Sequence, residues 1–236
     1  MPMRRFRTPK MPDPIVKGSY SFRISRPKYD RYVLEEIWDK DVYGIDHLPD
    51  HLEGVIIDVG AHIGGFAGRV RQKWPECTIF AFEPHPKNAR LFRKNARSNG
   101  WQKIHFFAKA ITKETQTVAL HLDPQNSAGH SLLDPGGRHQ VSVPGISIED
   151  MIRQEKIGEI GLMKLDCEGS EYDILENISP HTLNRIHYLL VEWHPIPHQH
   201  RGPLEERLLR AGFRTLREQP DPYVPNQHLT AYERSK

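Results

Sequence analysis

The chain has few cysteines, no long apolar run and little net charge, and these shortages exclude several classes of protein. Its 236 residues contain only two cysteines, Cys77 and Cys167, both within apolar runs, so we expect reduced thiols and no disulfide framework. No run approaches the roughly 20 apolar residues that a membrane-spanning helix needs. A charged fraction of 27% beside 37% hydrophobic residues excludes collagen, coiled coil and wholesale disorder, and predicts a globular domain.

The net charge of +3 is unevenly distributed. Met1–Arg31 holds nine Lys/Arg against two Asp, a surplus of +7, and the other 24 basic residues against 28 acidic ones give −4. A mildly acidic body suits a small-molecule ligand and disfavours nucleic acid, although the basic segment could contact an anionic substrate or carrier. Met1–Lys10 reads MPMRRFRTPK without a following apolar stretch, so it predicts no secretory signal, and we expect a cytoplasmic protein.

Residue patterning divides the chain into three parts. Residues 1–28 read as a basic, proline-containing arm without strand or helix periodicity, residues 29–53 as a helical cap, and residues 54–236 as the main domain. In the main domain, predicted strands (55–59, 78–82, 104–108, 162–165, 188–191) alternate with predicted helices (65–73, 86–99, 147–154, one from about 170, 204–211). This alternation predicts an α/β fold with a mostly parallel central sheet and helices on both faces.

Two pairs of strands are predicted outside this alternation. Residues 117–122 and 140–143 flank a polar loop that begins at Asp123. Residues 213–216 and 229–232 predict an antiparallel pair at the end of the chain. Within the polar loop, the segment 126–131 is predicted either to form part of a substrate wall or to be a solvent-exposed turn.

A glycine-containing turn follows the first predicted strand. It reads Asp58-Val-Gly60-Ala-His62-Ile-Gly64, and Glu83 ends the second strand. Ligands of parallel α/β sheets bind beyond the carboxyl ends of the strands, where an acid can accept hydrogen bonds from both hydroxyls of a ribose. The turn is not GxGxxG and no GxxxxGK[ST] occurs, so neither a dinucleotide fingerprint nor a P-loop is present. The alternative is that the glycines only make a tight strand-to-helix turn.

A second group of polar residues follows the fourth and fifth strands. Lys164-Leu-Asp166-Cys-Glu168-Gly-Ser-Glu171 follows the fourth strand, and Glu192 and His194 follow the fifth. Side chains two apart along a strand point to one side, so we expect Lys164 with Asp166, and Glu192 with His194, to share a face.

Taken together, these motifs resemble the FkbM family of S-adenosylmethionine-dependent methyltransferases. The resemblance spans residues 54–194 and rests on VIIDVGAHIGGFAG (55–68), AFEPHPKNARLFRKN (81–95), MKLDCEGSE (163–171) and VEWH (191–194). It implies a class I methyltransferase (Rossmann-like) fold and O-methylation of a hydroxyl on a sugar or another natural product. One departure is His62, where the family commonly has asparagine.

The resemblance also implies how S-adenosylmethionine is held. Asp58, Gly60 and His62 would line its methionine portion, Glu83 would hold the ribose hydroxyls, and Lys109 with Ala110 would lie near adenine. The full candidate set is Asp58, Gly60, Ala61, His62, Gly64, Glu83, Lys109, Ala110 and Asp166. Asp58 has a rationale of its own, because a carboxylate offsets the charge of the cofactor's ammonium group.

The candidate catalytic residues are His194, Asp166, Glu192 and Lys164. His194 is favoured as general base because the ordinary histidine pKa of about 6.5 suits proton transfer at neutral pH. The alternative is a surface histidine in the loop HPIPHQH. The other two acids of the motif have structural alternatives, since Glu168 could fix the turn and Glu171 could favour the helix dipole.

Metal binding is left open by the sequence. A divalent metal on Asp166 and Glu192 is compatible with the motifs, but the spacing does not distinguish metal ligands from other acids. A site of His194, His198 and His200 is disfavoured, because the intervening prolines prevent a helix from aligning the rings.

Two other functions remain as alternatives. One is methylation of an amino group in a small molecule, and the other is a non-catalytic module that binds S-adenosylmethionine. The Asn/Asp-Pro-Pro-Tyr/Phe signature of base methylation is absent, and the acids after the fourth and fifth strands disfavour a non-catalytic module. The acceptor and the oligomeric state are not predicted.

Overall fold

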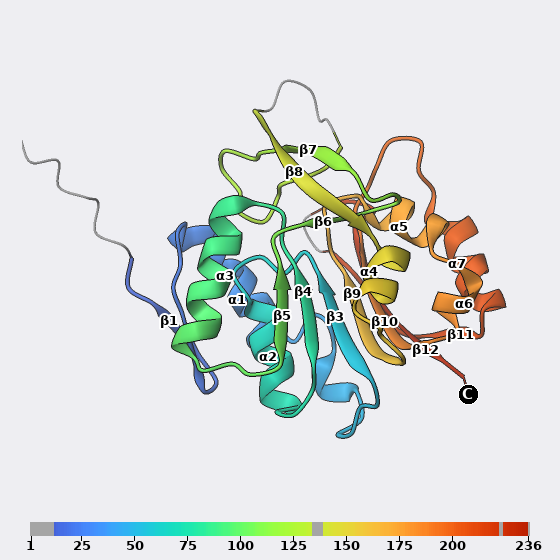
Figure 1. The fold of residues 1–236 in the computed structure, drawn as a ribbon, viewed down its shortest axis with the longest axis horizontal. Coiled ribbons are helices and arrows are strands. Elements are labelled where there is room, and N and C mark those ends of the chain that lie inside the picture. Colours follow the sequence, from blue (N-terminus) through green and yellow to red (C-terminus); the bar gives the residue numbers. More distant parts are fainter. Residues whose placement is uncertain (1–11, 134–138, 222–223, 236) are drawn as a thin grey trace, which may run out of the picture.

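Seven strands form the central sheet of the protein. The computed structural model describes residues 12–133, 139–221 and 224–235. In spatial order the strands are β11 (Phe213–Pro220), β12 (His228–Arg234), β10 (Ile186–Trp193), β9 (Ile160–Leu165), β3 (Val55–Val59), β4 (Ile79–Phe82) and β5 (Ile104–Phe107) (Figure 1). The five strands from β10 to β5 pair in parallel, whereas β12 is antiparallel to both of its neighbours. The predicted sheet, including its antiparallel C-terminal strand, is confirmed.

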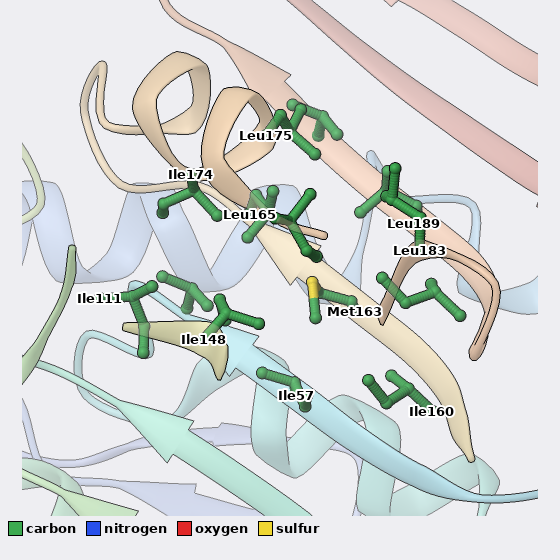
Figure 2. Packing of buried hydrophobic residues seen from close by; sticks show 14 of the residues in the cluster. Ile57, Ile111, Ile148, Ile160, Met163, Leu165, Ile174, Leu175, Leu183 and Leu189 are labelled. Atoms are coloured by element: carbon green, nitrogen blue, oxygen red, sulfur yellow. The ribbon is translucent and has the colours of Figure 1, made fainter. Parts of the chain in front are cut away.

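Helices cover both faces of this sheet, because its central strands are apolar on both sides. One face carries α1 (Pro27–Trp38), α2 (Gly65–Lys73) and α3 (Pro86–Ser98), and the other carries α4 (Ile148–Gln154), α5 (Glu171–Asn177), α6 (Pro180–Leu183) and α7 (Arg201–Arg210). Strand alternation divides the core, since Ile56 packs into the first layer and Ile57 into the second. Figure 2 shows the second layer, where Met163 and Leu165 meet Ile174 of α5.

Local signals fix where these helices begin. Pro86 occupies the first turn of α3. A backbone N–H at this position has no partner within the helix, so the proline costs no hydrogen bond. The Ser147 hydroxyl accepts the backbone N–H of Asp150 and caps α4, which starts one residue later than predicted. Within the described residues, no helix is long and apolar enough to cross a membrane. Cys77 and Cys167 are both free thiols.

A smaller sheet lies beyond the carboxyl ends of β3, β4 and β5 (Figure 1). Its order is β6 (Ala110–Thr112), β8 (Gln140–Ser147) and β7 (Thr117–His121). The antiparallel pairing of β7 with β8 confirms the two strands predicted around the polar loop. The segment 134–138 of that loop lies outside the described residues.

The N-terminal segment differs from the prediction. We expected residues 1–28 to lack strands, but β1 (Ile15–Lys17) and β2 (Tyr20–Phe22) form an antiparallel hairpin, and α1 begins at Pro27. Side-chain amides at the C-terminal end of α3 bind β2 and the residue after it: Asn99, which follows α3, accepts the N–H of Ser21, and Asn95 accepts that of Arg23. The hairpin was missed because its three-residue strands are too short to show a periodicity. The two asparagine side chains that bind this segment lie 72 to 78 residues away in the chain. Residues 1–11 of the predicted arm lie outside the described residues.

Candidate active site

A cavity of about 1050 Å³ opens at the carboxyl ends of the parallel strands. Its walls come from α1, from the ends of β3, β4, β9 and β10, from the loop before β8, and from the connection between β11 and β12. This is the position at which α/β sheets bind their ligands. The volume is large enough for a cofactor together with part of a second substrate.

The glycine turn after β3 brings two strand ends together. Gly60 has φ +80°, and a Cβ there would lie 1.8 Å from the carbonyl oxygen of Asp166, so only glycine allows this approach. Gly64 has φ +96° at the start of α2, and its Cβ position faces Trp101 at 3.1 Å. Gly60, Ala61 and His62 line the cavity, whereas Gly64 packs away from it. The tight-turn interpretation therefore describes Gly64.

Glu83 lies fully buried at the end of β4 and faces the same turn. Its two carboxylate oxygens accept the backbone N–H groups of His62 and His85, each at 2.8 Å. Burial raises the pKa of Glu83. A carboxylate offers about four acceptor positions, so capacity for ribose hydroxyls is left. Lys109 and Ala110 also line the cavity.

Asp30 of α1 ties three segments together behind this part of the cavity. It accepts the backbone N–H groups of Ser25 and Arg26 at 2.6 and 2.9 Å and the hydroxyl of Ser127 at 2.5 Å, and it lies 3.5 Å from His62 Nε2. Burial raises its pKa, but the hydrogen bonds and charge of these partners outweigh burial and hold the pKa well below its usual value. The sequence indicated only that Asp30 begins a helix.

The loop 126–131 contributes to the cavity wall near Glu83. Ser127 is 2% exposed, which contradicts the solvent-exposed turn that was the alternative for this loop. His130 Nδ1 accepts the N–H of Asp123 at 2.9 Å, so the ring proton sits on Nε2. Burial lowers the pKa of His130 to about 3, and the ring stays neutral. Among the described residues its buried Nε2 has no partner, which leaves a hydrogen-bond donor in the cavity wall.

Lys164 is a buried cation at the floor of the cavity. Its Nζ lies 3.4 Å from Asp58 Oδ1 and 3.0 Å from Asp166 Oδ2, and it donates to the carbonyl oxygens of Val59 and Gly60. Burial lowers the pKa of Lys164, but the two carboxylates outweigh burial and raise it overall. Asp58 is fully buried and does not line the cavity. Its charge is opposed by Lys164, and its predicted contact with a cofactor ammonium group stays a prediction.

Asp166, Glu192 and His194 form a triad at the other end of the cavity. One ligand atom from each lies within 4.8 Å of those of the other two. The geometry follows from the parallel register, in which Val191 of β10 pairs with Leu165 of β9. The Tyr43 hydroxyl donates to Asp166 Oδ2 at 2.6 Å and lies 3.3 Å from Glu192 Oε2.

Two further contacts orient this triad. Gln227, in the connection between β11 and β12, donates to Glu192 Oε1 at 2.6 Å. Glu171 Oε1 lies 3.1 Å from His194 Nδ1, and the Glu171 carboxylate also accepts the backbone N–H groups of Cys167 and Gly169. Glu171 therefore has a larger role than the helix-dipole interpretation predicted. Neither Tyr43 nor Gln227 belongs to a recognisable motif, and nothing in the sequence singled them out.

The charges around His194 are mainly negative. Its Nε2 lies 3.7 Å from Glu168 and 4.0 Å from Glu192. Burial lowers the pKa of His194, but the carboxylates of Glu171, Glu168 and Glu192 outweigh burial and raise it well above its ordinary value. Burial and the Asp166 charge raise the pKa of Glu192. His198 and His200 do not join the triad.

The comparisons with known proteins decide the family. The profile described as "Methyltransferase FkbM domain" matches residues 58–215. The chain belongs to the FkbM methyltransferase family. This confirms the resemblance seen in the sequence, and the seven-stranded sheet is that of class I methyltransferases.

Three relatives illustrate the likeness. The methyltransferase is 28% identical to the 31-O-demethyl-FK506 methyltransferase FkbM of Streptomyces tacrolimicus, over 80% of this chain and 84% of that one. It is 24% identical to the 2-O-methyltransferase NoeI of Sinorhizobium fredii, over 59% and 63% of the two chains. The solved FkbM methyltransferase of Methylobacillus flagellatus KT superposes with a TM-score of 0.53 at 16% identity, covering 81% of this chain and 46% of that one. The chain thus spans less than half of that protein, and this last likeness concerns the fold alone.

Proposed function

We propose that this methyltransferase transfers a methyl group from S-adenosylmethionine to a hydroxyl of a sugar or another natural product. The observation that carries the proposal is a single cavity that runs from Glu83 to the triad of Asp166, Glu192 and His194. One end offers the acid and the backbone turn that suit a nucleoside, and the other offers proton-accepting groups. Two relatives are named as enzymes of O-methylation, and this supports a hydroxyl acceptor.

The residues near Glu83 fit a polar nucleoside. Glu83 keeps acceptor capacity for ribose hydroxyls, and the buried Nε2–H of His130 is a donor that lacks a partner among the described residues. An unpaired buried donor is unfavourable by roughly 1–3 kcal/mol, which a ligand acceptor would recover. Gly60, Ala61, His62, Lys109 and Ala110 would complete this cofactor subsite. In our proposal, Asp58 affects the cofactor subsite indirectly, through its ion pair with Lys164, and Gly64 affects it by allowing the turn after β3.

The cofactor supplies an electrophilic methyl group. The S–CH3 bond breaks with its electron pair left on sulfur, an oxygen lone pair of the acceptor forms the O–CH3 bond, and the hydroxyl proton is released. In the proposal the neutral form of His194 receives this proton through Nε2, because Glu171 occupies Nδ1, and the raised pKa of His194 makes this form more populated as pH rises. Asp166 and Glu192 bind the acceptor hydroxyl, and the ion pair with Lys164 orients Asp166.

A screen by mass spectrometry tests this function. The purified protein is incubated with methyl-deuterated S-adenosylmethionine and a panel of sugars, polyketides and amines, and each product is examined for a trideuteromethyl gain. We expect the label on hydroxyl oxygen and none with His194→Ala. Label on nitrogen would replace the hydroxyl acceptor by an amine. Saturable cofactor binding without transfer to any panel member would favour the non-catalytic module.

A further inference from the structure

The triad at the acceptor end has the composition of a metal centre. We propose that Asp166, Glu192 and His194 bind a divalent cation. Two carboxylates and one imidazole are ligands that suit Mn²⁺ or Fe²⁺, and more weakly Mg²⁺. Ligands of an octahedral cation with bonds of about 2.1 Å lie roughly 3–4.2 Å apart. The ligand atoms of the triad, all within 4.8 Å of one another, need to move only slightly to reach this geometry.

Each member of the triad also contacts a neighbouring polar side chain. Glu171 Oε1 lies 3.1 Å from Nδ1 of His194, so that Nε2 presents its lone pair to the triad once Nδ1 carries the proton. Gln227 donates to Glu192 Oε1 and Tyr43 to Asp166 Oδ2, each at 2.6 Å. Metal-ligating histidines usually contact a carboxylate, and ligating carboxylates usually accept hydrogen bonds. These contacts orient the ligand side chains before a metal binds.

The negative charge around the triad also favours a bound cation. The carboxylates of Asp166, Glu168, Glu171 and Glu192 gather around His194 and the cavity floor. Lys164 lies at the cavity floor and contacts Asp166, but its charge is shared with Asp58 and with two backbone carbonyls. Lys164 and Tyr43 both contact Oδ2 of Asp166, and within the described residues Oδ1 remains available for a cation.

A cation bound at the acceptor end of the cavity would take part in catalysis, and this part of the inference rests on the proposed function. A divalent cation at the triad would hold the acceptor hydroxyl as a further ligand and lower its pKa, so that the proton leaves to water. His194 then serves as a ligand through Nε2 and no longer receives the proton. Lys164 and Glu171 keep their positions in both cases.

Manganese titration tests the site without an acceptor or a cofactor. The full chain is stripped with EDTA and titrated with Mn²⁺, and free Mn²⁺ is followed by electron paramagnetic resonance. We expect one bound Mn²⁺ per chain, a dissociation constant raised at least tenfold by Glu192→Gln and by His194→Ala, and one raised about 10- to 100-fold by Glu171→Gln. Glu206→Gln, an exposed acid of α7, is the matched control and leaves the constant unchanged.

The opposite results overturn the inference and leave the proposed function standing. Absence of stoichiometric binding at millimolar Mn²⁺ and Mg²⁺, by folded protein that still binds S-adenosylmethionine, eliminates the site. Unchanged Mn²⁺ affinity in both Glu192→Gln and His194→Ala places the cation elsewhere. Undiminished methyl transfer by the EDTA-stripped enzyme removes the catalytic task. Melting curves of each variant separate these results from unfolding.

Discussion

The two ends of the cavity are built in different ways. At the cofactor end, Glu83 is held by backbone N–H groups of His62 and His85, which lie 21 and 2 residues from it in the chain. At the acceptor end, the triad is held by side chains from distant segments, Tyr43 and Gln227 among them. The first end therefore depends on the local turn of one βαβ unit. The second depends on how the segment after α1 and the β11–β12 connection pack against the sheet.

The largest expected effect separates catalysis at the acceptor end from binding at the cofactor end. His194→Ala removes the proposed proton acceptor or metal ligand and lowers kcat about 10²- to 10⁴-fold. The Kd of S-adenosylmethionine stays within about twofold, because the side chain touches no cofactor-end residue. Turnover is measured by mass spectrometry and Kd by calorimetry. His198→Asn in the neighbouring loop is the control, and an unchanged kcat in His194→Ala would remove the residue from the reaction.

The cofactor end is tested by Glu83→Gln. The substitution removes the charge that would hold the ribose hydroxyls, and hydrogen bonds to a charged group contribute about 1.5–3 kcal/mol. We expect the Kd of S-adenosylmethionine to rise about 10- to 100-fold. Asp166→Asn, at the acceptor end, should raise it less than threefold. Equal effects of the two variants in calorimetry would contradict the division of the cavity into two ends.

Asp30, which packs near the cofactor end, makes the free energy of unfolding depend on pH. The pKa of Asp30 is lowered in the folded protein, so its ionised form stabilises the fold above the unfolded pKa of about 3.9, and this stabilisation is lost as pH falls. Asp30→Asn should lower the free energy of unfolding by about 1–3 kcal/mol at pH 7. Urea titrations should show the gap to the wild type shrinking below pH ~4. Asp39→Asn, at the exposed end of α1, is the control, and a gap independent of pH argues against an ionised Asp30.

The smallest effect sharpens the description of the acceptor end. Tyr43→Phe removes the hydroxyl that donates to Asp166 and leaves the ring in place. One hydrogen bond contributes about 1 kcal/mol, so kcat should fall roughly fivefold while the Kd of S-adenosylmethionine is unchanged. Tyr188→Phe, whose hydroxyl bonds to Glu233 away from the cavity, should change neither quantity. A rise in cofactor Kd would place Tyr43 at the other end.

The same contrast explains what the sequence could predict. Buried strands and helix starts are local, so the elements from β3 to β5 are predicted nearly to the residue, and the parallel pairing of the central strands is predicted as well. Cavity residues carried by the glycine turn and the strand ends, such as His62, Glu83 and Asp166, are also found from their motifs. The hairpin β1–β2 was missed, because its strands are only three residues long and its contacts with Asn95 and Asn99 are long-range.

Residues whose role depends on long-range packing escaped prediction. Tyr43 and Asp166 are 123 residues apart, and Glu192 and Gln227 are 35 apart, so no spacing relates them. Asp58 shows the converse case. Its motif was recognised, but its ion pair with Lys164 was not predicted, because strand alternation was used to pair Lys164 with Asp166 alone.

Calorimetric titration of the folded wild-type protein with S-adenosylmethionine tests the central claim most directly. We predict saturable binding of one cofactor per chain with a Kd of about 1–100 µM, weakened at least tenfold in Glu83→Gln. No heat of binding at millimolar cofactor, from protein whose melting curve shows it to be folded, would contradict the claim that this cavity holds S-adenosylmethionine.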